Sequence, residues 1–257
     1  MRIDVLLGEA LPTPHEVLGK VVVVIDVLRA ATTVVTALAN GARAVIPFDS
    51  VDEPVTLSKQ YERSEYRLAG ERKMQRIDGF DLGNSPLEYT RPVVQGRTIL
   101  YSTTNGTVAL VASTGSAVCY FAAFVNCSET IKAARAASRD DIDVLIVCAG
   151  HERRVTLEDV VCAGRIARGL ARGRSSVKWT DGARSAALLE RRYATNFDKL
   201  RADATHARSL AIAGFEADVE MCFSLDTQPL VVTYQDRQLR GLDVVPRARP
   251  DTTRKAS

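Results

Sequence analysis

Apolar runs rich in β-branched residues recur along the chain. They are KVVVVID ending at Asp26, ARAVIPF ending at Phe48, RTILYST around Tyr101, AVCYFAAF around Phe121 and IDVLIVCAG ending at Gly150. Because these runs are apolar throughout rather than alternating, they are typical of strands buried on both faces of a sheet. The pattern predicts a central sheet.

Segments with helical periodicity follow several of these runs, at 30–40, 127–137 and 157–171. The first should end at Asn40-Gly41, a left-handed helix stop. From about 176 to 223 the pattern is helix after helix, and a last strand-like run, LVVTY, follows. Strands alternating with amphipathic helices predict an α/β fold of three layers, a mixed sheet flanked by helices.

The chain has 257 residues, enough for one sizeable domain. We expect a single catalytic domain over 1–245 and a disordered basic tail over 246–257. The net charge is +3, and the tail carries four basic residues and one acid, so the body is close to neutral. No basic stripe with interleaved aromatic residues is visible, which argues against nucleic-acid binding.

No apolar run is long enough for a signal peptide or a membrane span, so we expect a soluble, cytoplasmic protein with no membrane partner. The five cysteines form an odd set without C-x-x-C spacing. They are expected to be buried free thiols in a reducing compartment.

The stretch GFDLGNSPLEY, residues 79–89, is unusually rich in glycine and polar residues. Part of it resembles a helix start, with Ser85 as N-cap, Pro86 at the first helical position and Glu88 closing a capping box. Asp81 and Asn84 are not needed for that start. With close-approach glycines beside a helix N-terminus, they suit an anion held next to a metal.

Polar residues also follow the strand-like runs, where ligands gather in open α/β sheets. Asp26 closes the first run and Arg29 comes soon after; such a carboxylate suits a metal or phosphoryl acceptor, or else the N-cap of the next helix. The turn Thr103, Thr104, Asn105 and Gly106 could cradle an anion, although Asn-Gly is also the usual hairpin signal. Arg72, in GER at 70–72, could face an anion.

The segment CAGHERRVTLEDVVCAG, 148–164, has the same form: strand, glycine turn, then a helix that opens with acids. Thr156 and Asp159 fit a capping arrangement, which leaves Glu158 as the better ligand or base. Cys148 and Arg154 match the C-x5-R spacing of cysteine phosphatases, which we interpret as accidental. The three histidines are too scattered along the chain for a metal site, and no nucleotide-binding glycine loop is present.

Taken together, DVLRAATT, GER, GFDLGNSPLEY, TTNGT, FVN at 124–126 and LEDVVCAG have the order and spacing of the 2-phosphosulfolactate phosphatase family, the ComB-like proteins. The resemblance runs from about Ile3 to Tyr234. It implies a ComB-like α/β fold and Mg²⁺-dependent hydrolysis of (2R)-O-phospho-3-sulfolactate to (2R)-3-sulfolactate and phosphate, a step of coenzyme M biosynthesis. A substrate with phosphate, sulfonate and carboxylate groups needs arginines and N–H cradles.

We therefore expect a Mg²⁺-dependent phosphatase acting on a small anionic phosphomonoester. The assigned roles are catalysis by Asp26, Glu158 and Asp159, metal binding by Asp26, Asp81 and Glu158, and substrate binding by Arg29, Arg72, Asn84, Thr103, Thr104, Asn105, Gly106 and Asn126. The nucleophile is either metal-bound water or Asp26.

The turn after Gly150 departs from the family, in which it is small and contains glycine; here it is His151-Glu152-Arg153-Arg154. This departure bears on substrate identity more than on reaction type. Three alternatives stay open: a phosphatase for a different small acidic phosphomonoester, a non-catalytic anion-binding relative, and a metal-independent cysteine phosphatase. The oligomeric state is also open, and a homo-oligomer is one of its alternatives.

Overall fold

The computed structural model describes residues 1–139 and 142–242. Within these ranges, eleven strands form one sheet in the order β5-β4-β6-β3-β11-β10-β7-β2-β8-β1-β9. The strands are β1 (Arg2–Leu6), β2 (Val21–Ile25), β3 (Ala44–Phe48), β4 (Tyr66–Arg72), β5 (Gln75–Arg76), β6 (Thr98–Ser102), β7 (Val118–Ala122), β8 (Val144–Cys148), β9 (Lys178–Trp179), β10 (Val231–Gln235) and β11 (Gln238–Leu242). The α/β class with a mixed sheet is confirmed.

The sheet consists of two parallel parts with an antiparallel hairpin between them. One part holds β7, β2, β8, β1 and β9, and the other holds β3, β6 and β4. The hairpin β10–β11 pairs antiparallel with β7 on one side and β3 on the other. The run LVVTY therefore forms β10, an interior strand of the sheet. Its hairpin partner β11 was not predicted from the sequence.

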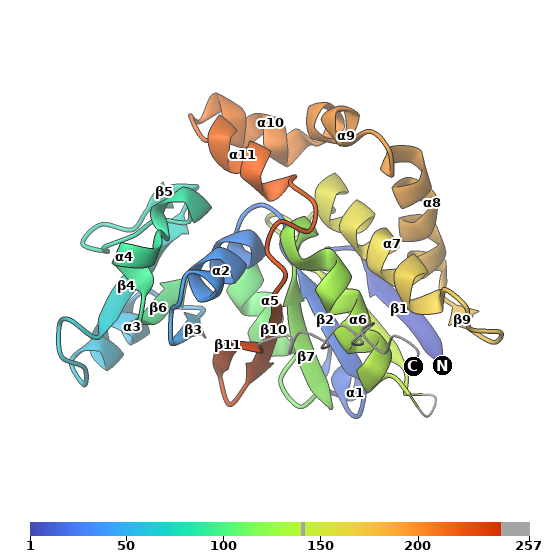
Figure 1. Ribbon diagram of the computed structural model, residues 1–257, viewed down its shortest axis with the longest axis horizontal. Helices are drawn as coiled ribbons and strands as arrows, with labels where there is room; N and C mark the ends of the chain where they lie inside the picture. Colours follow the sequence, from blue (N-terminus) through green and yellow to red (C-terminus); the bar gives the residue numbers. More distant parts are fainter. Residues whose placement is uncertain (140–141, 243–257) are drawn as a thin grey trace, which may run out of the picture.

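Helices flank this sheet (Figure 1). They are α1 (Pro14–Val17), α2 (Ala30–Ala39), α3 (Asp52–Ser58), α4 (Arg91–Val94), α5 (Gly106–Ala112), α6 (Cys127–Ala137), α7 (Leu157–Ala171), α8 (Asp181–Tyr193), α9 (Phe197–Asp203), α10 (Thr205–Ile212) and α11 (Glu216–Cys222), with single 3₁₀ turns η1 (Pro86–Glu88) and η2 (Phe124–Asn126). The predicted helices at 127–137 and 157–171 are confirmed. So is the stop after α2, where Gly41 has φ +92°.

The strands β2, β3, β6 and β8 are buried at every residue, as their continuous apolar sequences require. Helices α9, α10 and α11 form an arch beyond the ends of the strands (Figure 1). The arch contacts the segment after β2, because His206 on α10 bonds the carbonyl of Leu28 and Asp218 on α11 pairs with Arg29. It therefore covers the loops in which the polar motifs lie.

At two helix starts, one sequence-based expectation is wrong and one alternative is excluded. Ser85 makes no capping bond, and η1 is a single 3₁₀ turn; the Ser85 hydroxyl donates to Asp218 and the Glu88 carboxylate accepts from the Gly83 N–H. Asn105-Gly106 is no hairpin, since Gly106 begins α5. In both places tertiary partners replace the local ones.

The five cysteines are all free and buried, as expected. Within the described ranges no helix combines the length and the apolar character that a membrane crossing requires. The expected basic tail, 246–257, lies outside the described residues.

Candidate active site

A cavity of about 480 Å³ lies between the strand-end loops and the arch. Its walls come from the loop after β2, the β4–β5 turn, the loop before α5, the turn after β8, and α10. It is lined by Asp26, Leu28, Arg29, Ala30, Glu71, Arg72, Lys73, Met74, Asn84, Thr103, Thr104, Asn105, His151, Glu152, His206 and Leu210. The carboxyl ends of parallel strands thus meet in one place, as open α/β sheets predict.

Asp26 directly follows β2 and is 4% exposed. Its Oδ1 accepts the Ala30 N–H at 3.0 Å, so one oxygen does cap the start of α2. Within the described part of the chain, Oδ2 accepts no hydrogen bond. Burial, and next the neighbouring Asp159, raise the pKa of Asp26 well above its ordinary value. A carboxylate with one free oxygen, desolvated beside another acid, would be stabilised by a cation.

Gly106 leaves room for that free oxygen. A Cβ at this position would lie 2.6 Å from Asp26 Oδ2, closer than such atoms approach, and 3.0 Å from the Ala30 Cβ, which is a tight contact. The preceding Thr103 hydroxyl is buried and has no partner among the described residues. The loop therefore brings close-packed backbone and an unused hydroxyl to the side of the cavity that holds Asp26.

Glu71 is a site residue that the sequence analysis missed. It is 7% exposed, and its carboxylate accepts the Thr104 N–H at 3.0 Å, the Thr104 hydroxyl at 2.9 Å and the Met74 N–H at 3.0 Å. Thr104 is thereby engaged with protein. The segment GER at 70–72 contains both residues, but its sequence does not indicate that Glu71 is buried at the cavity.

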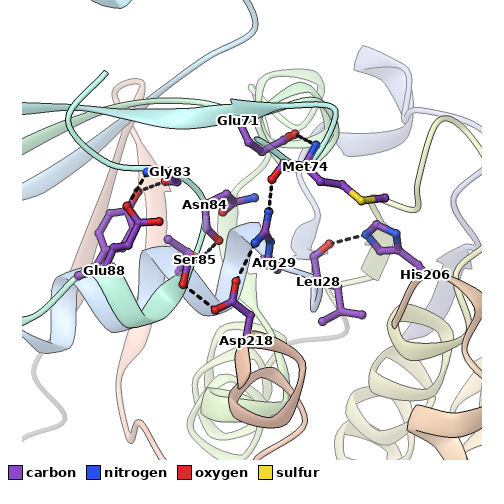
Figure 2. A network of polar contacts seen from close by, with 12 residues as sticks. Leu28, Arg29, Glu71, Met74, Gly83, Asn84, Ser85, Glu88, His206 and Asp218 are labelled. Atoms are coloured by element: carbon purple, nitrogen blue, oxygen red, sulfur yellow. Dashed lines mark hydrogen bonds and ion pairs between the residues drawn. The ribbon is translucent and has the colours of Figure 1, made fainter. Parts of the chain in front are cut away.

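Arg29 and Arg72 both line the cavity. The Arg29 guanidinium donates to Asp218 Oδ2 at 2.7 Å and to the Met74 carbonyl at 2.9 Å (Figure 2), and it lies 4.1 Å from the centre of the Phe215 ring. Arg72 donates to Ser102 Oγ at 2.8 Å. Arg29 is fixed by a buried counter-ion, whereas Arg72 has no acidic partner within the described residues.

The Asn84 side chain contacts protein through its oxygen and lines the cavity. Its Oδ1 accepts from the Tyr101 hydroxyl, and its backbone carbonyl accepts from Thr33. The Nδ2 group has no partner among the described residues and belongs to a side chain that lines the cavity. The hydroxyl of Tyr101 therefore orients the amide so that an N–H donor is left for a ligand.

Glu158 and Asp159 lie beside the cavity without lining it. Asp159 accepts the Val27 N–H at 2.8 Å and the Gly150 N–H at 3.0 Å, so it ties together the loops after β2 and β8 instead of capping α7. Burial is the main cause that raises the pKa of Asp159 to about 6 and of Glu158 to about 8. Glu158 Oε2 is buried without a partner in the described chain.

Asp81 and Asn126 are not brought to the cavity. Asp81 pairs with Arg63 and accepts the Leu68 N–H at 2.9 Å, which fixes the loop that follows β5. Asn126 is fully buried and bonds the backbone of Ala123, Phe121 and Leu230. Both sets of contacts hold the chain together rather than present a ligand group. Asn105 Oδ1 accepts from the Glu152 N–H and connects α5 to the turn after β8.

Two of the three histidines, which lie far apart along the chain, meet in the wall of the cavity. The rings of His151 and His206 stack with centroids 4.1 Å apart. His206 Nε2 lies 3.2 Å from the Leu28 carbonyl, and burial lowers the pKa of His206 to about 4. The sequence carried no signal for this pair, because 54 positions separate the two residues.

The donors of the cavity fit a hard cation. In the described chain no three His, Cys, Asp or Glu side chains are grouped to hold a metal ion by themselves. Mg²⁺ does not require three, since it is usually bound through one or two carboxylates, with waters and substrate phosphate completing its shell. The free oxygen of Asp26 would be one such ligand, and the Glu71 carboxylate, whose charge acts on Asp26, would be the second.

Comparison with known proteins decides the family. The family model of 2-phosphosulpholactate phosphatase matches residues 9–237. The chain belongs to the 2-phosphosulfolactate phosphatase family. A member from Symbiobacterium thermophilum, named as a probable 2-phosphosulfolactate phosphatase, is 38% identical over 229 residues, which are 89% of this chain and 97% of the relative.

Other members of the 2-phosphosulfolactate phosphatase family show similar agreement. The relative from Caldanaerobacter subterraneus subsp. tengcongensis is 38% identical over 212 residues, 82% of this chain and 86% of its own. The relative from Thermotoga maritima is 37% identical over 224 residues, 87% of this chain and 91% of its own. Both are named as probable 2-phosphosulfolactate phosphatases. The match to the family model, 9–237, covers every segment of the cavity wall.

Proposed function

We propose that this protein is a Mg²⁺-dependent phosphatase that hydrolyses (2R)-O-phospho-3-sulfolactate to (2R)-3-sulfolactate and phosphate. The observation that carries the proposal is the buried Asp26 carboxylate, which keeps one oxygen free in the wall of a polar cavity. Family membership and the names of the relatives agree with the reaction. The product would belong to coenzyme M biosynthesis.

The charges of the cavity support a need for a cation. Its lining contains three acids, Asp26, Glu71 and Glu152, and three basic residues, Arg29, Arg72 and Lys73, so the two signs of charge are equal in number. A substrate with phosphate, sulfonate and carboxylate groups would then enter without any excess of positive charge. Bound Mg²⁺ would supply that charge at the phosphoryl oxygens.

The residues take the following roles in this proposal. Asp26 and Glu71 would hold Mg²⁺, in place of the more distant Asp81 and the occluded Glu158. Arg72 and the amide of Asn84 would bind the acidic groups of the substrate, with Arg29 in a fixed position behind them. Asp159 would position Asp26 through the backbone of Val27.

The attacking group is either water or Asp26, which would form an aspartyl phosphate. Trapping with beryllium fluoride distinguishes the two mechanisms, because a covalent-like adduct on Asp26 excludes direct attack by water. A cysteine nucleophile receives no support. Cys148 is 1% exposed and lies at the end of β8, and burial raises its pKa well above the ordinary value.

A second candidate substrate is a different small acidic phosphomonoester. The turn after β8 brings His151 and Glu152 into the cavity wall, and Glu152 and Arg153 have φ of +49° and +57°. A carboxylate and an imidazole at this wall would change which acidic groups fit. An assay of phosphosulfolactate beside a panel of other phosphomonoesters distinguishes these substrates. If another ester alone is hydrolysed, the substrate assignment is wrong and the proposed mechanism still holds.

The deciding experiment is phosphate release from racemic phosphosulfolactate with Mg²⁺ and with EDTA. We expect Mg²⁺-dependent turnover that falls at least about a hundredfold in Asp26→Asn, since one charge contact to a transition state is worth that much. Asp198→Asn, whose side chain is 93% exposed, is the matched control and should keep its activity. Turnover that persists in EDTA would contradict the proposed dependence on Mg²⁺. If the folded protein hydrolyses none of the esters, the result would favour a non-catalytic anion-binding protein.

A further inference from the structure

A second concave surface lies on the outer side of α7 and α8, and it shares no lining residue with the active-site cavity. This groove has a volume of about 850 Å³. Its two helices lie side by side in Figure 1, with β9 near one end. They approach closely because of Gly164, where a Cβ would lie 2.1 Å from the Ala186 carbonyl oxygen. The arginine groove is defined by its five arginines: Arg165, Arg168, Arg172, Arg184 and Arg191.

The arginine groove carries a large excess of positive charge. Its lining contains one acid, Glu190, against the five guanidinium groups. Glu190 is 4% exposed; it pairs with Arg168 and lies 3.6 Å from Arg165. A buried carboxylate therefore fixes the direction of two guanidinium groups, which is what a preorganised anion site needs.

The other three arginines have no counter-ion. Arg172, Arg184 and Arg191 are exposed, and their side chains make no ion pair or hydrogen bond within the described residues. Concentrating like charges in one groove opposes folding unless another interaction compensates for it. An anionic ligand is the simplest source of compensation.

Apolar residues also line the arginine groove. It contains Trp179 and Leu188, and Leu188 is 65% exposed. Trp179 is the sole tryptophan of the sequence, and it is partly buried against the core. An aromatic ring that lines the same groove as planar guanidinium groups suits a ligand that has a flat apolar part next to its charges.

We propose that the arginine groove binds a small molecule that carries two or more linked phosphate groups. Guanidinium groups hold phosphate oxygens in bidentate geometry, and the volume is that of ordinary small-molecule sites. A second copy of this chain does not fit, because an isologous contact would bring the same excess of positive charge together. A nucleic acid would require a basic stripe extending beyond one groove.

Trp179 reports binding in this groove without interference from the active site. The probes are inorganic triphosphate, ATP, adenosine and orthophosphate, titrated at 150 mM KCl while the tryptophan fluorescence is followed. We expect a saturable change with triphosphate and ATP and none with adenosine. Tighter binding of ATP than of triphosphate would identify a nucleotide, and equal binding would identify the phosphate chain alone as the recognised chemistry.

The variant Arg184→Gln/Arg191→Gln should weaken triphosphate binding at least tenfold. The control Arg43→Gln/Arg91→Gln removes the same charge from exposed arginines outside the groove and should bind as the wild type does. If triphosphate binding weakened equally in both variants, general charge attraction would explain the effect and the proposal would be overturned. No saturable change with triphosphate would also overturn it, and the active-site assays are unaffected by either result.

Discussion

The contact between Asp218 and Arg29 should be the most sensitive link between the arch and the sheet. Asp218 Oδ2 accepts from Arg29 at 2.7 Å, and the two side chains are 4% and 2% exposed. Asp218 Oδ1 accepts from the Ser85 hydroxyl at 2.6 Å (Figure 2). Asp218→Ala would leave a guanidinium group buried without its counter-ion, in contact with the carbonyl of Met74 and the ring of Phe215.

The size of the effect follows from burial. Removing one partner of a buried ion pair costs about 3–5 kcal/mol of unfolding free energy, since the remaining charge has lost both water and partner. Ser85→Ala keeps the pair and removes one hydrogen bond to a charged group, so its cost should be about 1.5 kcal/mol. Asp198→Ala breaks an exposed pair with Arg201 and should cost less than about 0.5 kcal/mol.

Urea unfolding followed by circular dichroism measures these differences. The expected order of stability loss is Asp218→Ala, then Ser85→Ala, then Asp198→Ala. The double variant Arg29→Met/Asp218→Leu should recover at least half of the loss, because it removes both charges. If Asp218→Ala lost less than about 1 kcal/mol, the pair would not be desolvated and the arch would be held by other contacts.

Two further predictions concern the cavity. Gly106→Ala places a Cβ against Asp26 Oδ2, so the rate of phosphate release should fall about a hundredfold. The control is Gly169→Ala, which is equally crowded but against the flexible Ile131 side chain, and it should keep its activity. Equal losses in the two variants would contradict the role of Gly106. His206 has a pKa of about 4 in the fold and 6.5 as its ordinary value, so the unfolded chain binds this proton first and stability falls as pH drops below 6.5. Between pH 7.5 and 5, the free energy of unfolding measured in urea should fall by about 2 kcal/mol more for the wild type than for His206→Gln. Identical decreases would show that the folded protein lets His206 take up a proton.

Local sequence was sufficient for most of the elements. The apolar runs predicted β2, β3, β6, β7, β8 and β10, and helical periodicity placed the helices at 127–137 and 157–171 correctly. It also placed Asp26, Arg29 and the 103–106 turn at strand ends, where the cavity lies. These predictions succeed because burial on both faces and helix periodicity are properties of consecutive residues.

Partnerships between distant residues could not be predicted from these patterns. Glu71 and the His151–His206 pair line the cavity because the β4–β5 turn and the arch fold over the ends of the strands. Asp218, on the arch, reaches Arg29 for the same reason. Asp81, an equally plausible acid in the sequence, instead pairs with Arg63. A carboxylate has the same local signature in either place, and only packing decides its partner.

The sequence by itself determined the α/β class, the order of the elements and the family, because strand burial, helix periodicity and the ordered motifs are all written in neighbouring residues. The tertiary structure alone decided which acids share the cavity, that the C-terminal hairpin joins the two parts of the sheet, and that five arginines gather in one groove. Those outcomes depend on contacts between residues far apart in the chain, whose energies are set by burial and charge in the folded state.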